Sequence, residues 1–215
     1  MYLVIFLFRG VIMQDEVSLN IQKAIEESIK VKELVLKDEL NKVLVEIGEL
    51  IVKSILQGGK VLLCGNGGSA ADAQHLTAEF LIRLTSEVNR EGIPAISLLQ
   101  DSSTFTAAVN DFNPNELFKR NFQTLSKPED ILMAISTSGN SENIVKVLET
   151  AKKTNNKTVG FLGSEGGKSL KYCDVAFVVP SNKTARIQEA HITAGHAVIE
   201  YVEARLIEEG FLALS

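Results

Sequence analysis

Residues 60–70 read KVLLCGNGGSA, and this stretch decides the fold. Its first half is an apolar run typical of a buried parallel strand, and its second half is a glycine-rich turn. Residues 70–84, which follow, are expected to form a helix. Backbone amides at a helix N-terminus bind anions such as phosphate. The stretch therefore predicts an α/β protein with an anion site after its first strand.

The rest of the chain repeats this alternation of strand and helix. Strands are expected at 60–64, 95–99, 131–135, 158–162 and 175–179, and helices near 70–84, 103–109, 115–124, 141–153, 168–171 and 184–209. Residues from about 18 to 56 are helical in period, and Gly58-Gly59 ends that pattern. The expected fold is a three-layer α/β sandwich with a five-stranded parallel, flavodoxin-like sheet plus N-terminal helices, and ligands should bind at the carboxyl ends of the strands.

Length and composition indicate one domain. The 215 residues are 45% hydrophobic, enough for one substantial core. Residues 14–215 are expected to form this domain, and residues 1–13 are an N-terminal extension of doubtful status. The apolar start is shorter than the ~20 residues of a membrane helix and makes a poor signal peptide. It is either a strand or arm packed on a neighbour or, the favoured interpretation, an upstream extension with Met13 as the natural start.

Charge and cysteine content exclude several classes of function. The formal net charge is −5 and the 22 Lys and Arg residues are scattered, so no basic stripe is available for nucleic acid. Binding to a DNA-binding protein stays open. The two cysteines, Cys64 and Cys173, lie far apart and are expected to be reduced thiols of a cytoplasmic protein without a membrane partner.

The glycine turn allows more than one ligand. Gly65, Gly67 and Ala70 also fit the dinucleotide pattern G-x-G-x-x-A. The acidic residue expected about 20 positions later is poorly matched by Glu87 and Glu91, which disfavours NAD. No G-x-x-x-x-G-K-[ST] pattern occurs, which disfavours a nucleotide triphosphatase. A phosphate or sugar site is favoured over a tight turn without a ligand.

A second loop, ISTSGNS at residues 135–141, follows the expected third strand and precedes a helix. An ordinary helix cap would use one or two hydroxyl groups. This loop offers four, from Ser136, Thr137, Ser138 and Ser141, beside the amides of a helix N-terminus. The loop is therefore a candidate phosphate cradle.

Two polar pairs indicate proton or metal chemistry. His75 and Glu79 are four residues apart, so they project from one face of the helix after the glycine turn. Gln188 and His196 lie on the last helix, about 80° out of alignment. Both side chains can contact the same atom only if a ligand or metal lies between them. Histidine nitrogen and glutamate oxygen are ordinary zinc ligands, whereas glutamine is an uncommon one. His191 faces elsewhere and is expected to be structural.

These residues together resemble a known family. GNGGS at 65–69, Gln74-His75, the loop at 135–141 and Arg186-Ile187-Gln188-Glu189 are similar to the sugar isomerase (SIS) family, and within it to the phosphoheptose isomerases. The similarity extends from about Ser18 to Glu209. The combination is far more specific than any one of these motifs.

The resemblance implies a homotetramer that converts the phosphorylated sugar sedoheptulose 7-phosphate to D-glycero-D-manno-heptose 7-phosphate, the first step towards nucleotide-activated heptose. It implies one zinc per subunit at positions matching His75, Glu79, Gln188 and His196. The matching substrate contacts are Asn66, Gly67, Gly68, Ser69, Arg83, Asp111, Ser136, Thr137, Ser138, Ser141 and Gln188. We expect Glu79 to be the carbon base and His196 its acid/base counterpart, because an enediol path needs a positioned base.

Two departures and two alternatives accompany the resemblance. Residues 80–84 lack the Gly-Arg-Tyr expected around Arg83, and Ala185 stands where some members carry aspartate. A non-enzymatic relative that binds the bacterial replication initiator shares both loops but has asparagine in place of the second histidine. His196 therefore favours an enzyme. An isomerase of another phosphosugar stays open, because phosphate loops are generic.

Overall fold

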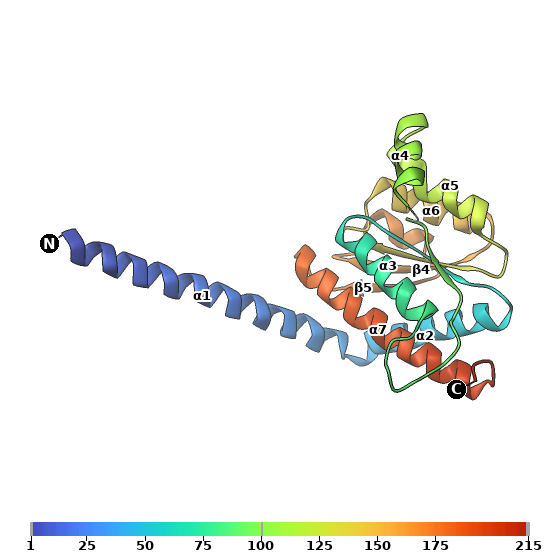
Figure 1. The fold of residues 1–215 in the computed structure, drawn as a ribbon, viewed down its shortest axis with the longest axis horizontal. Coiled ribbons are helices and arrows are strands. Elements are labelled where there is room, and N and C mark those ends of the chain that lie inside the picture. Colours follow the sequence, from blue (N-terminus) through green and yellow to red (C-terminus); the bar gives the residue numbers. More distant parts are fainter. Residues whose placement is uncertain (1, 100, 214–215) are drawn as a thin grey trace.

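Two helices precede the sheet. The computed structural model describes residues 2–99 and 101–213, and in it α1 (Tyr2–Val35) and α2 (Asp38–Leu56) follow one another directly. The helical segment expected from about residue 18 thus begins at Tyr2, and the helix passes through Met13 without a break. The alternative of an N-terminal strand is wrong. The first half of α1 projects well beyond the body of the domain (Figure 1).

The sheet has five parallel strands, as expected. They are β1 (Val61–Gly65), β2 (Ala95–Ser97), β3 (Ile131–Ser136), β4 (Lys157–Gly163) and β5 (Val175–Val179), in the order β2-β1-β3-β4-β5. β2 is shorter than predicted because the Leu99 backbone N–H turns back to Ser97 Oγ at 3.3 Å. From β1 the chain continues to β2 on one side and then crosses to β3 on the other, so the topological switch point lies between β1 and β3, where ligands of such sheets bind.

Helices cover both faces of the sheet (Figure 1). The remaining helices are α3 (Gly68–Leu81), α4 (Ser102–Asp111), α5 (Leu117–Leu125), α6 (Glu142–Lys153) and α7 (Thr184–Glu208), with 3₁₀ turns η1 (Pro114–Glu116) and η2 (Gly167–Tyr172). α2, α3 and α7 share one core with Leu63 and Met133, and α5 and α6 share the other with Leu62 and Leu132. Successive strand residues thus serve opposite faces. Cys64 and Cys173 are free thiols.

His191 of α7 is structural, as expected. Its side chain is 1% exposed and lies beside the rings of Phe161 and Phe177. Its Nε2 donates to the Leu162 carbonyl oxygen of β4 at 3.0 Å. Burial lowers the pKa of His191 from 6.5 to about 4. The folded chain therefore holds this imidazole neutral at pH values where an unfolded chain would protonate it.

This burial predicts a pH-dependent stability. Between pH 6.5 and about 4 the unfolded chain binds the extra proton, so the free energy of unfolding falls as the pH is lowered through that window. We expect a fall of about 2 kcal/mol between pH 7 and pH 5 from this residue alone. The variant His191→Gln keeps a donor for Leu162 but cannot titrate, so it should lack this component. Urea unfolding of both proteins measures it, and identical pH dependence would contradict the assignment.

Candidate active site

The two predicted loops lie side by side at the carboxyl edge of the sheet. β1 and β3 are neighbours, with Gly65 in register with Ile135. The glycine turn and the loop of residues 135–141, called the hydroxyl loop below, therefore leave adjacent strands. The side-chain amide of Asn66 in the glycine turn bonds to that of Asn143, in the first turn of α6 directly after the hydroxyl loop. The two stretches that were predicted to form anion sites therefore lie next to each other in the fold, although they are distant in the sequence.

In the glycine turn, Gly67 caps α3 and Gly68 is its first residue. Asn66 is exposed, whereas Ser69 is buried and its N–H donates to the Asn66 carbonyl at 3.0 Å. The Gln188 amide packs on Gly68 so closely that a Cβ there would stand 2.4 Å from Gln188 Nε2. Glycine at this position therefore lets Gln188 of α7 reach the turn.

The hydroxyl loop keeps most of its donors available. Ser136 Oγ and Ser138 Oγ accept hydrogen bonds from the N–H groups of Gly139 and Asn140, both at 3.1 Å, so their own O–H groups can donate elsewhere. Ser141 occupies the N-cap of α6 but makes no side-chain capping bond. Four hydroxyls beside a helix N-terminus can hold a phosphate without a cation.

The acid/base cluster forms between α3 and α7. His75 Nε2 lies 2.9 Å from His196 Nε2 and 3.6 Å from Glu79 Oε1. The two rings meet edge to face, with centroids 5.1 Å apart. His75 thus stands between the predicted base and its predicted acid/base partner.

Close helix packing brings the two histidines together. A Cβ at Gly195 would stand 2.8 Å from the Leu76 methyl carbons, so glycine lets α7 approach α3 at this level. His196 follows Gly195 and His75 precedes Leu76 in the chain. The distance between the two histidine rings therefore depends on the contact between Gly195 and Leu76, their neighbours in the sequence.

Asp72 belongs to this cluster although the sequence did not single it out. Its carboxyl oxygen Oδ2 is buried and has no hydrogen-bond partner among the described residues. Burial raises the pKa of Asp72, and the nearby His75 and His196 oppose that shift. Asp72 lies one turn before His75 on α3, a spacing that could have revealed it.

Arg90 is a second residue that the sequence did not reveal. Its buried guanidinium pairs with Glu203 of α7. Its Nη2 donates to the Glu79 carbonyl oxygen at 3.0 Å and its Nη1 to the Phe80 carbonyl oxygen at 3.1 Å. Arg90 therefore ties the end of α3 to α7, the two helices that carry the cluster.

The donor types suit a zinc ion, and the distance between the two histidine nitrogens is that of a direct hydrogen bond. Two imidazoles and a carboxylate are ordinary zinc ligands, but two nitrogens on one tetrahedral zinc stand about 3.3 Å apart, slightly farther than His75 from His196 here. Within the described residues, no group of three or more His, Cys, Asp or Glu side chains is arranged to hold a metal. The orphaned Asp72 oxygen beside them is consistent with an electropositive group at this place.

Two predicted substrate contacts lie apart from the loops. Arg83 follows the C-terminal end of α3, about 20 Å along the helix axis from the glycine turn. Asp111 ends α4, where Asn110 Nδ2 donates to its carboxylate at 2.7 Å. No hydrogen bond within the described chain joins either residue to the two loops.

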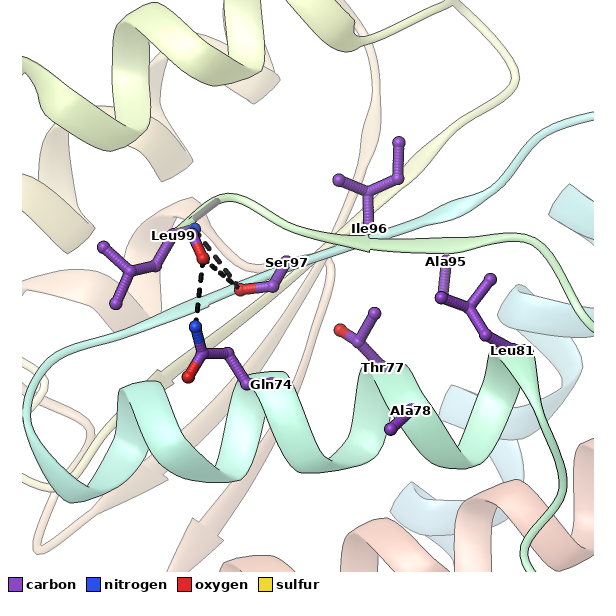
Figure 2. Close-up of a pocket in the computed structure, with 8 residues that line it drawn as sticks. All are labelled: Gln74, Thr77, Ala78, Leu81, Ala95, Ile96, Ser97 and Leu99. Atoms are coloured by element: carbon purple, nitrogen blue, oxygen red, sulfur yellow. Dashed lines mark hydrogen bonds between the residues drawn. The ribbon is translucent and has the colours of Figure 1, made fainter. Parts of the chain in front are cut away.

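An open cavity of about 390 Å³ lies between another face of α3 and β2. Figure 2 shows Gln74, Thr77 and Leu81 lining it opposite Ser97 and Leu99, with Gln74 Nε2 donating to the Leu99 carbonyl at 3.2 Å. Its lining carries no ionisable side chain. The ionisable cluster of His75, Glu79 and His196 therefore does not line this cavity.

Fold and site define a class of protein. A parallel sheet in this strand order, with a hydroxyl loop after β3, is that of a SIS domain, and residues 25–163 match the SIS domain family. The chain belongs to the phosphoheptose isomerase family. It is 45% identical over 193 residues to the phosphoheptose isomerase of Thermodesulfovibrio yellowstonii, covering 90% of this chain and 94% of that one.

Solved structures agree with this family. The chain superposes on a phosphoheptose isomerase from Francisella tularensis with a TM-score of 0.82 at 34% identity, covering 87% of this chain and 98% of that chain. On the phosphoheptose isomerase from Neisseria gonorrhoeae the TM-score is 0.76 at 32% identity, covering 89% and 99%. The fold class and the family resemblance predicted from the sequence are confirmed.

Proposed function

We propose that this protein is an aldose–ketose isomerase that converts sedoheptulose 7-phosphate to D-glycero-D-manno-heptose 7-phosphate, the first step towards nucleotide-activated heptose. The observation that carries the proposal is the contact between His75, Glu79 and His196 beside two anion-binding loops. Family membership supports the sugar, because SIS phosphate loops alone do not specify one.

In this proposal the hydroxyl loop holds the phosphate and the glycine turn holds the sugar. Ser136, Thr137, Ser138 and Ser141 donate to the phosphate oxygens. Asn66, Ser69 and Gln188 then orient the carbonyl end of the sugar toward the cluster, with Gly67 and Gly68 giving close backbone approach. A phosphate fixed at one end and a carbonyl at the other places the reacting carbons beside Glu79.

The reaction moves one proton between neighbouring carbons. Glu79 removes the proton from C1 of the ketose while His196 donates a proton to the C2 oxygen, which gives the enediol. Glu79 then returns its proton to C2 and His196 takes one from the C1 hydroxyl, which gives the aldose and regenerates both groups. His75 orients Glu79 and His196 from its position between them.

We further propose that the site binds zinc through His75, Glu79, Gln188 and His196. Bound zinc would supply Lewis-acid polarisation of the substrate oxygens. The separation of the two histidine nitrogens has to open by only a few tenths of an ångström. The donor types of His75, Glu79 and His196 support this assignment, whereas Gln188 would be an uncommon ligand.

The proposed assembly is a cytoplasmic homotetramer without nucleic acid or membrane partners. Ile21, Ile25 and Ile29 form a stripe along α1 and are 64%, 57% and 51% exposed, a pattern suited to packing against another copy. Within the described residues, no helix combines the length and apolarity needed to cross a bilayer.

One assay tests this function. The purified protein is incubated with sedoheptulose 7-phosphate and the aldose phosphate is followed by NMR. We expect conversion, its loss after dialysis against a chelator, and its return with zinc. Conversion unaffected by the chelator would remove the metal from the proposal. No conversion by a folded, zinc-supplemented protein would favour the alternative of a non-enzymatic binding protein.

A further inference from the structure

A reciprocal pair of amides joins the two loops of the site. Asn66 Nδ2 donates to Asn143 Oδ1 at 2.9 Å, and Asn143 Nδ2 donates to Asn66 Oδ1 at 2.8 Å. The two residues are 77 positions apart in the chain. Asn66 belongs to the glycine turn after β1, and Asn143 lies in the first turn of α6, directly after the hydroxyl loop.

Asn143 is anchored on its own side of the pair. Its Oδ1 also accepts the backbone N–H of Ile144 at 3.0 Å, and Ile144 is fully buried in the core shared by α5 and α6. A carbonyl oxygen has two lone pairs, so both lone pairs of Asn143 Oδ1 are used. Asn143 is therefore held by the helix that carries the hydroxyl loop, with no acceptor left for a ligand.

Asn66 keeps half of its hydrogen-bonding capacity. A primary amide has two N–H donors and two lone pairs, and the pair with Asn143 uses one of each. The exposed Asn66 side chain therefore retains one donor and one acceptor, and its amide plane is fixed by two bonds. Without Asn143 this side chain would rotate freely on an exposed glycine turn.

We infer that Asn143 is a positioning residue that fixes the Asn66 amide for the sugar and sets the glycine turn against the hydroxyl loop. The inference rests on the proposed function, in which Asn66 contacts the sugar and the hydroxyl loop contacts the phosphate. Asn143 thereby sets the position of the group that contacts the sugar relative to the loop that contacts the phosphate. Asn143 itself need not touch the substrate.

A double-substitution cycle tests the inference. The kcat and KM for sedoheptulose 7-phosphate are measured for the parent protein, N66A, N143A and the double variant. We expect N143A to lower kcat/KM roughly tenfold, in line with the loss of positioned hydrogen bonds. Because Asn143 acts through Asn66, adding N143A to N66A should cause little further loss. Multiplicative losses, or an unchanged N143A protein, would overturn the inference.

Two measurements separate positioning from damage to α6. Asn115→Ala is the matched control, because Asn115 Nδ2 bonds to Glu142 of the same turn at 2.8 Å without touching Asn66, and its kinetics should stay unchanged. Inorganic phosphate should raise the Tm of N143A as much as that of the parent. Loss of that response would mean that Asn143 supports the phosphate loop itself, which overturns the inference. If the parent protein converts no substrate, the proposed function has failed instead.

Discussion

Replacing Glu79 with glutamine should abolish the exchange of the substrate's carbon-bound proton with solvent. Glutamine has nearly the same shape, so it can keep the contact that Glu79 makes with His75, but it cannot accept a proton from carbon. Loss of a positioned general base lowers turnover by roughly 10²–10⁴-fold, and we expect a fall in kcat in that range. Incubation in D₂O, followed by NMR of the sedoheptulose 7-phosphate C1 protons, measures the exchange directly.

The matched control is Glu87→Gln, an exposed glutamate beyond the C-terminal end of α3. This variant should exchange and isomerise like the parent protein. The Tm of the Glu79 variant, and its response to inorganic phosphate, should stay close to those of the parent because the hydroxyl loop is untouched. Undiminished proton exchange in a folded Glu79→Gln protein would remove Glu79 from the role of carbon base.

Local patterns in the sequence predicted most of what a single helix or loop determines in the site, although Asp72, one turn before His75 on α3, was missed. The spacing of His75 and Glu79 placed both on one face of a helix, and His75 Nε2 lies 3.6 Å from Glu79 Oε1. The alternation of strands and helices gave the parallel sheet, and adjacent strands then brought the two loops together. These features depend on helix period and strand pairing, which short stretches of sequence encode.

Contacts between distant segments were not predictable in the same way. The approach of His196 to His75 depends on Gly195 packing against Leu76, and nothing local to either helix indicates that packing. Asn143 reads as an ordinary residue of a first helical turn. Arg90 reads as a loop residue, because the carboxylate of Glu203 and the carbonyls of α3 meet it only in the fold.

The start of the chain shows a different limit of prediction from the sequence. An apolar run of this length is compatible with a strand or a helix, and periodicity alone does not distinguish them. The structure continues one helix through Met13 from Tyr2. Arg83 shows a further limit of prediction, because the resemblance places it at the substrate whereas one copy of the chain leaves it at the far end of α3.

Replacing His196 with glutamine should separate binding from turnover. The glutamine amide can occupy the place of the imidazole Nε2 and keep a hydrogen bond to His75, but it cannot exchange a proton with the substrate oxygens at neutral pH. We expect kcat to fall roughly 10²–10⁴-fold while the response of Tm to inorganic phosphate is kept.

Glu200→Gln is the matched control, because Glu200 is exposed one turn after His196 on α7 and its replacement should leave kcat unchanged.

Adding zinc distinguishes the two roles proposed for His196. If His196 served only as a metal ligand, saturating zinc would restore kcat in the variant, since three ligands and the glutamine amide would remain. An acid/base role predicts that kcat stays low at every zinc concentration. Parent-like kcat in the variant would leave proton transfer to the oxygens to another group, and Asp72 is the ionisable side chain next to His196.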